Sequence, residues 1–121
     1  ALGSAINDSN VDSLNCKVII EAANGPVTGG AANKLWEQKI PVIPDILTNA
    51  GGVTVSYFEW VQNIQQFKWS EDEVNKKLED KMVQAFKEVY DVKVKKEIPM
   101  RIASFMVAID RVERSYRLRG G

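Results

Sequence analysis

Histidine is absent from the 121 residues, and cysteine occurs once, as Cys16. The first absence excludes Ser-His-Asp and Cys-His catalytic groups and any histidine-based zinc site within this chain. A lone cysteine cannot form an internal disulfide, so we expect a cytoplasmic location. Without a histidine to activate it, Cys16 is expected to be a small apolar residue at the start of a strand. We expect no metal site, so any chemistry depends on carboxylates, lysines, backbone groups or a cofactor.

The chain also lacks an excess of charge of either sign. Sixteen basic and sixteen acidic residues give a formal net charge of zero, so no basic surplus points to nucleic acid. No apolar run approaches the ~20 residues that cross a bilayer, and no signal peptide opens the chain. A composition of 45% hydrophobic and 26% charged residues is ordinary for one globular domain or part of one. We therefore expect neither a nucleic-acid nor a membrane partner.

Two apolar runs rich in β-branched residues predict buried parallel strands, at residues 17–22 and 40–46. Between them, Asn24-Gly25-Pro26 breaks the chain, and Thr28 can cap a helix that runs to about Gln38. A strand, a helix and a second strand within this length form a βαβ unit. The sheet is then parallel and the crossover right-handed.

Three further helices are expected. The first spans residues 52–66, because apolar and aromatic residues at helical spacing follow the β-branched Val53, Thr54 and Val55. Ser70 with Glu73 forms a capping box that opens a second helix, over residues 71–90. The charged stretch 91–97 either ends or extends that helix, and residues 99–119 form the last one.

Two strands do not make an independently stable sheet. Both strands are apolar on both faces and need neighbours, and the chain starts as if in the middle of an element. We therefore predict an α/β fold: the later half of a Rossmann-like doubly wound parallel sheet plus C-terminal helices. The sheet portion covers residues 1–66 and the helical portion residues 67–121, with earlier strands encoded upstream.

The turns that follow the two strands are the candidate site. Each offers an asparagine, Asn24 or Asn49, beside small residues and glycine, and ligands of open α/β sheets lie beyond the carboxyl ends of strands. An asparagine amide can donate and accept together, and small residues let a flat ligand approach the backbone. The alternative is that Asn24 and Asn49 only shape turns and that Gly51-Gly52 only permits a bend. No G-x-G-x-x-G motif occurs.

Three motifs resemble glutamate dehydrogenase, of the Glu/Leu/Phe/Val dehydrogenase family. They are Glu-Ala-Ala-Asn-Gly-Pro-Val-Thr at 21–28, Ile-Pro-Asp-Ile-Leu at 43–47, and Asn-Ala-Gly-Gly-Val-Thr-Val-Ser-Tyr-Phe-Glu-Trp at 49–60. Residues 101–120 resemble the C-terminal helices of the family, so the resemblance covers essentially the whole chain. The ending Ser-Tyr-Phe-Glu-Trp is not typical of leucine, phenylalanine or valine dehydrogenases. It favours glutamate as the substrate.

The resemblance implies a partial NAD(P)-binding domain of an enzyme that interconverts L-glutamate with 2-oxoglutarate and ammonia, using NAD or NADP. The full-length family forms homo-hexamers. By position, Asn24 resembles the residue near the nicotinamide ribose and Asn49 the one between nicotinamide and substrate. Val53 and Ser56 resemble residues of the substrate side-chain pocket, Ser56 binding the distal carboxylate. The alternative for Ser56 is a serine bonded back to its own helix.

The resemblance also implies that the catalytic N-terminal domain is absent. The catalytic lysine and aspartate of the family and its phosphate loop would lie upstream of Ala1, so no catalytic residue is expected here and the chain alone should be inactive. Arg101 and Arg111 are expected at the surface or at a domain contact, and Glu59 and Trp60 in structural roles. Two alternatives stay open: a non-catalytic, self-associating fragment, and a branched-chain or aromatic amino acid dehydrogenase.

Overall fold

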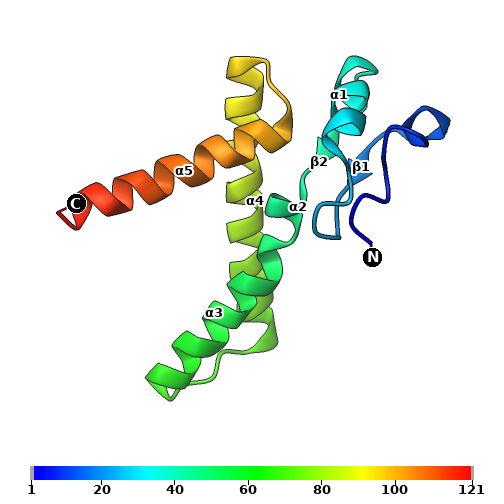
Figure 1. The fold of residues 1–121 in the computed structure, drawn as a ribbon. Coiled ribbons are helices and arrows are strands. Elements are labelled where there is room, and N and C mark those ends of the chain that lie inside the picture. Colours follow the sequence, from blue (N-terminus) through cyan, green and yellow to red (C-terminus); the bar gives the residue numbers. More distant parts are fainter. Residues whose placement is uncertain (1, 121) are drawn as a thin grey trace.

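The computed structural model describes residues 2–120 (Figure 1). The described part is mostly helical, with one small sheet of two parallel strands. After a short 3₁₀ helix, Val11–Ser13, the elements are β1 (Ile19–Ile20), α1 (Gly29–Glu37), β2 (Val42–Ile43), α2 (Asp45–Thr48), α3 (Ala50–Gln65), α4 (Glu71–Lys96) and α5 (Met100–Leu118). Within these residues no helix is long and apolar enough to cross a membrane.

The two strands pair as expected but are much shorter than the sequence predicts. Ile19 lies opposite Val42 and Ile20 opposite Ile43, in parallel register. Prolines flank β2 at positions 41 and 44. Proline has no N–H to donate to a ladder, which limits β2 to two residues and β1 with it. The βαβ order is confirmed, because α1 connects the strands.

The boundary after β2 was predicted wrongly. Ile46 was expected to end the strand, but it lies in α2, a single helical turn whose N-cap is Pro44. The expected glycine-rich turn before residue 52 is helical as well, since α3 already begins at Ala50. Asp45 favours this early start because an acidic residue in the first turn stabilises a helix, and its carboxylate accepts a hydrogen bond from the Ile46 N–H.

Each face of the sheet supplies one of two small cores. Val42 points toward α1 and packs against the buried Leu35 and Ala31. Ile43, on the opposite face, packs against the buried side chains of α2, α4 and α5, which are Leu47, Val89, Met100 and Ala103. Among residues 2–120, β1 is covered only on the α1 side, since Ile20 on its other face is 61% exposed.

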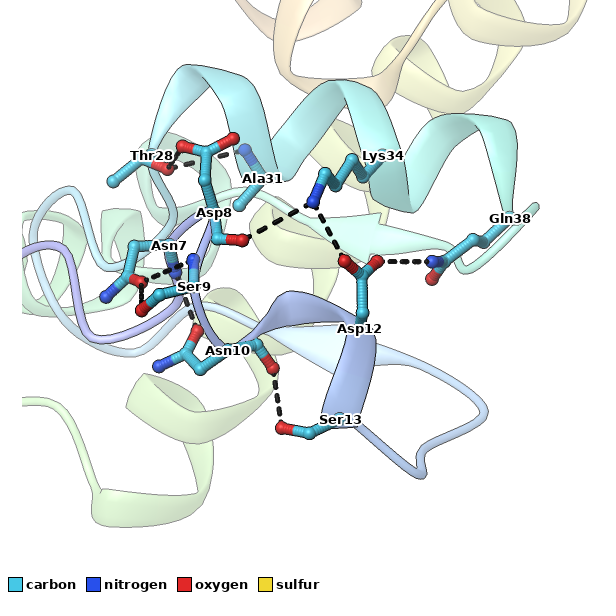
Figure 2. Close-up of polar contacts among 10 residues, drawn as sticks. All are labelled: Asn7, Asp8, Ser9, Asn10, Asp12, Ser13, Thr28, Ala31, Lys34 and Gln38. Atoms are coloured by element: carbon cyan, nitrogen blue, oxygen red, sulfur yellow. Dashed lines mark hydrogen bonds and ion pairs between the residues drawn. The ribbon is translucent and has the colours of Figure 1, made fainter.

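The segment before β1 is held on α1 by polar contacts (Figure 2). Lys34 forms an ion pair with Asp12 at 2.8 Å, and the Thr28 side chain caps α1 by accepting from the Ala31 N–H. The Asp8 carboxylate lies against Gly30, where an added Cβ would approach its Oδ1 to 2.2 Å. A larger residue at position 30 would therefore displace the Asp8 side chain from this contact. Cys16, expected at a strand start, is instead exposed in the loop before β1.

The helical half is built around α4. Its capping box is confirmed, with Ser70 and Glu73 each bonding the other's backbone N–H. The charged stretch 91–97 extends the helix through Lys96 and does not end it at residue 90. In Figure 1, α3 runs alongside α4, while α5 crosses α4 and its red C-terminal half projects away from it. At the crossing, Arg111 forms an ion pair with Glu88.

Candidate functional site

The turns after β1 and β2 meet, as their position at the same edge of a parallel sheet requires. The Asn49 side-chain amide donates a hydrogen bond to the Asn24 side-chain oxygen at 3.2 Å. Asn24 is exposed and Asn49 is half-buried. This hydrogen bond uses one N–H of the Asn49 amide and the side-chain oxygen of Asn24. The other donors and acceptors of the two amides remain available to a ligand. The sequence-based placement of both turns at the same edge of the sheet is confirmed.

Beneath the asparagines lies a charged network formed by Glu21, Asp45 and Arg101. The Glu21 side chain is fully buried at the end of β1, and its Oε2 accepts from the Asp45 N–H at 2.8 Å. Arg101, in the first turn of α5, donates to Glu21 Oε2 and, at 3.0 Å, to Asp45 Oδ1. The second Asp45 oxygen accepts from the Gly25 N–H at 2.7 Å. Four separate segments are thereby tied together.

The environment of Asp45 favours its charged form. Burial by itself would raise the pKa of this carboxyl, but hydrogen bonds from the Gly25 and Ile46 N–H groups and the charge of Arg101 outweigh it and lower the pKa below the usual 3.8. Asp45 is therefore a carboxylate near neutral pH and acts as a fixed acceptor. Its role is to hold the turns in place rather than to donate a proton.

Above this network an open hollow of about 550 Å³ lies between the two turns and the starts of α3 and α5. Its lining residues are Asn24, Asp45, Ile46, Asn49, Ala50, Val53, Thr54, Arg101 and Phe105. Three predicted site residues, Asn24, Asn49 and Val53, thus face the same space. The hollow combines amide groups with apolar side chains, which suits a ligand that has a flat ring and polar substituents.

Ser56 does not line this hollow. It lies farther along α3, where its hydroxyl donates to the Gly52 carbonyl oxygen at 3.0 Å. This contact is the back-bonded arrangement that the sequence left open. The side chain is exposed, and the hydroxyl can bond an acceptor such as a carboxylate only by turning its single proton away from the Gly52 carbonyl.

Arg101 is the site residue that the sequence reasoning missed. It was expected at the surface or at a domain contact, yet its side chain is only 28% exposed and it borders the hollow. The available signal was Glu21, an acid that ends an apolar strand and needs a partner when buried. The identity of that partner, 80 positions away, was not visible in the sequence. Arg111 is exposed, and Glu59 and Trp60 are exposed as well.

The comparison that decides the family is a sequence match over nearly the whole chain. The profile described as Glutamate/Leucine/Phenylalanine/Valine dehydrogenase matches residues 1–120. The chain belongs to the glutamate/leucine/phenylalanine/valine dehydrogenase family. Within it, this family member is 44% identical over 120 residues to an NAD-specific glutamate dehydrogenase of Staphylococcus aureus.

Solved structures of the glutamate/leucine/phenylalanine/valine dehydrogenase family agree with this assignment. Glutamate dehydrogenase from Peptoniphilus asaccharolyticus is 42% identical and superposes with a TM-score of 0.94 over 99% of this chain. The hetero-hexameric glutamate dehydrogenase of Thermus thermophilus, in its Leu-bound form, is 27% identical with a TM-score of 0.92 over 98% of the chain. The arrangement of helices and of the small sheet is therefore that of a glutamate dehydrogenase segment.

The match covers only part of these enzymes. The chain spans 29% of the length of the Staphylococcus aureus relative, 30% of the Peptoniphilus chain and 29% of the Thermus chain. Within residues 2–120, no group of three or more histidine, cysteine, aspartate or glutamate side chains is arranged to hold a metal ion. The family assignment therefore applies to a segment about 30% as long as these enzymes.

Proposed function

We propose that this chain forms the nicotinamide-side and substrate-side wall of an NAD-dependent glutamate dehydrogenase, which interconverts L-glutamate with 2-oxoglutarate and ammonia. The observation that carries the proposal is the pairing of Asn24 with Asn49 at the edge of the open hollow. The proposal is also supported by the 44% identity to an enzyme described as NAD-specific glutamate dehydrogenase. On this proposal NAD is the cofactor, in preference to NADP.

The donor set of the hollow fits the nicotinamide end of such a cofactor. Asn24 and Asn49 would hold the ribose and carboxamide groups, because an amide both donates and accepts hydrogen bonds. Val53, 75% exposed at the mouth of the hollow, would contact the substrate side chain. The bound nicotinamide would supply hydride transfer, and the chain's own residues orient the reactants and exclude water beside them. Ser56 is proposed to bind the distal carboxylate of glutamate by rotating its hydroxyl proton from the Gly52 carbonyl to the carboxylate, which only accepts hydrogen bonds.

The proposal extends to the architecture. The two strands would be the later strands of a Rossmann-like doubly wound sheet, residues 1–66 its last part and residues 67–121 the C-terminal helices. The catalytic residues and the phosphate-binding loop would lie in other parts of the longer polypeptide. Assembly into a homo-hexamer is proposed by analogy with the family, and a cytoplasmic location stays a prediction from the sequence.

The deciding experiment compares two lengths of protein. The longer polypeptide encoded with this segment should oxidise L-glutamate with NAD, followed as NADH absorbance, whereas the 121 residues alone should show no glutamate-dependent NADH formation. In the longer protein, Asn49→Ala should raise the KM for NAD. Glutamate-dependent turnover by the 121 residues would contradict the proposed absence of catalytic groups. A longer protein without NAD-linked glutamate oxidation would contradict the function itself.

A second candidate is a non-catalytic fragment that associates with itself. Large apolar side chains are exposed along α3 and α5, among them Trp60, Ile64, Ile109 and Val112, each more than half exposed. Exposed apolar side chains in such number favour association. A related branched-chain or aromatic amino acid dehydrogenase is the third candidate, and substrate preference separates it from the first.

A further inference from the structure

We propose that Arg101, Glu21 and Asp45 are positioning residues, which hold the Asn24 and Asn49 amides in the geometry that binds the nicotinamide end of the cofactor. The inference rests on the proposed function for the identity of the ligand. A continuous chain of hydrogen bonds and ion pairs leads from Arg101 of α5 to both asparagine-bearing turns.

Asp45 is bonded to both asparagine-bearing turns. Its Oδ2 accepts from the N–H of Gly25, the residue directly after Asn24, at 2.7 Å. Its carbonyl oxygen accepts from the N–H of Asn49 at 2.8 Å. A shift of Asp45 would therefore move the two amides relative to each other. Gly25 adopts φ +58, a left-handed conformation that glycine adopts without strain, and this allows the sharp turn that presents its N–H to Asp45.

Glu21 and Arg101 in turn fix Asp45. The buried Glu21 carboxylate holds the Asp45 N–H at 2.8 Å, and the Arg101 guanidinium holds Asp45 Oδ1 at 3.0 Å while it also bonds Glu21. A guanidinium carries several donors in one rigid plane, so a single arginine can fix the distance between two carboxylates. The backbone of Glu21 is anchored as well, because its N–H donates to the Ile43 carbonyl at 3.0 Å.

Stability alone is a poor explanation for this network. Two carboxylates share one guanidinium, and within the described residues no donor reaches the buried Glu21 Oε1. Buried ion pairs often stabilise a fold less than apolar side chains of similar size would. What the network does supply is a fixed relation between the end of β1, the Gly25 turn, the start of α2 and the start of α5. Arg101 and Asp45 also border the hollow, so the network lies directly against the proposed ligand.

Arg111 provides a matched control. It lies on the same helix and is also paired with a carboxylate, Glu88 of α4, but it does not border the hollow. The double variant Glu21→Gln with Arg101→Met separates positioning from folding. Arg101→Met alone leaves two carboxylates without their guanidinium and should lower the melting temperature. Neutralising Glu21 as well removes one of these buried charges and should restore much of that loss.

The test uses the longest natural polypeptide that carries residues 1–121. Melting temperature, the Kd for NADH from fluorescence titration, and the KM values and kcat are measured for the wild type, R101M, E21Q/R101M and R111M. We expect R101M and the double variant to weaken NADH binding and to raise the KM for NAD by about tenfold, the effect of losing one well-formed hydrogen bond to the cofactor. R111M should bind NADH like the wild type.

The separate changes in kcat, KM and Kd distinguish a positioning role of Arg101 from a purely structural one. A loss of folded protein lowers the apparent kcat and leaves KM unchanged, whereas displaced asparagines raise KM and Kd. Unchanged NADH binding in R101M, or recovery of wild-type binding in the double variant together with its stability, would overturn the inference while the proposed function stands. A wild-type protein that neither binds NADH nor oxidises glutamate would remove the proposed function, and the inference with it.

Discussion

Ser56 and its contact with the Gly52 carbonyl oxygen are the feature on which substrate choice can be tested most directly. The proposed partner of its hydroxyl is the distal carboxylate of glutamate, which norvaline lacks. In the longer enzyme, Ser56→Ala should raise the KM for glutamate by about tenfold or more, because a hydrogen bond to a charged group is lost. Norvaline should be affected much less. Steady-state kinetics with both substrates measures the difference, and equal effects on the two would remove Ser56 from carboxylate recognition.

Asp45 makes the fold sensitive to acid in a defined direction. Its pKa is lowered in the folded chain by the Gly25 and Ile46 N–H groups and by Arg101, against the opposing effect of burial. A carboxyl with a lowered folded-state pKa stabilises the fold above its unfolded pKa, and that contribution is lost as the pH falls through the folded value. The stability that the Asp45 carboxylate contributes is therefore lost at pH values below about 4.

Asp45→Asn should remove this part of the pH dependence. At pH 7 the variant should unfold at a lower urea concentration than the wild type. This difference in urea midpoint should narrow as the pH is lowered from 5 to 2.5, because the unfolded wild type then binds a proton at Asp45 more readily than the folded wild type does. Urea unfolding at several pH values checks the expectation. A gap of constant size across that range would mean that the charge of Asp45 contributes nothing.

At the residue level, the sequence predicted what lies close to a motif and missed what lies far along the chain. The turns that carry Asn24 and Asn49 were correctly placed together, because each follows a strand and parallel strands end at one edge. Arg101 was missed because its partnership with Glu21 depends on how α5 returns to the sheet. Neither helical periodicity nor local composition carries that information.

Among the helices, α4 begins with the most clearly defined local signal. Ser70 accepts from the Glu73 N–H at 3.3 Å, and Glu73 accepts from the Ser70 N–H at 2.8 Å. Ser70→Ala should lower the free energy of unfolding by about 1 kcal/mol, the typical cost of a lost N-cap. Ser115→Ala is the control, because this exposed serine bonds only back to the Arg111 carbonyl of its own helix and should change stability by less than about 0.5 kcal/mol. Chemical denaturation of both variants measures this, and equal losses would contradict a capping role.

The elements differ in how far local sequence determined them. The capping box and the Thr28 cap were read correctly because both depend on residues three positions apart. The strands were predicted too long because an apolar β-branched run indicates burial in a sheet and does not specify how many residues find a hydrogen-bonding neighbour. The charged stretch at residues 91–97 was ambiguous in isolation. Packing of Val92 against the α4–α5 core favours its helical form.

On the scale of the whole molecule, apolar surface is distributed unevenly. Within the part of the chain that the structure describes, no helix covers Ile20 on β1. Helix α5 exposes a stripe of apolar residues along its length: Ile102, Phe105, Met106, Ile109, Val112, Tyr116 and Leu118. The helical spacing of five of them, Ile102, Phe105, Met106, Ile109 and Val112, predicts an inward-facing stripe, but all five side chains are exposed. The spacing was right, yet within the described residues only the first turns of the helix meet a core. Helical periodicity identifies an apolar face but not the surface that covers it.

This distribution predicts that the isolated chain self-associates. Burial of apolar area is favourable by about 25 cal/mol per Å², and the stripe on α5 offers several side chains that only another surface can cover. Light scattering after size exclusion should therefore give a mass above the 13.5 kDa of the monomer. Ile109→Ser with Val112→Ser should lower that mass, whereas Arg119→Ser, an exposed change at the end of the same helix, should not. A monodisperse species of monomer mass for the unmodified chain would show that α5 remains stable in water with this face uncovered.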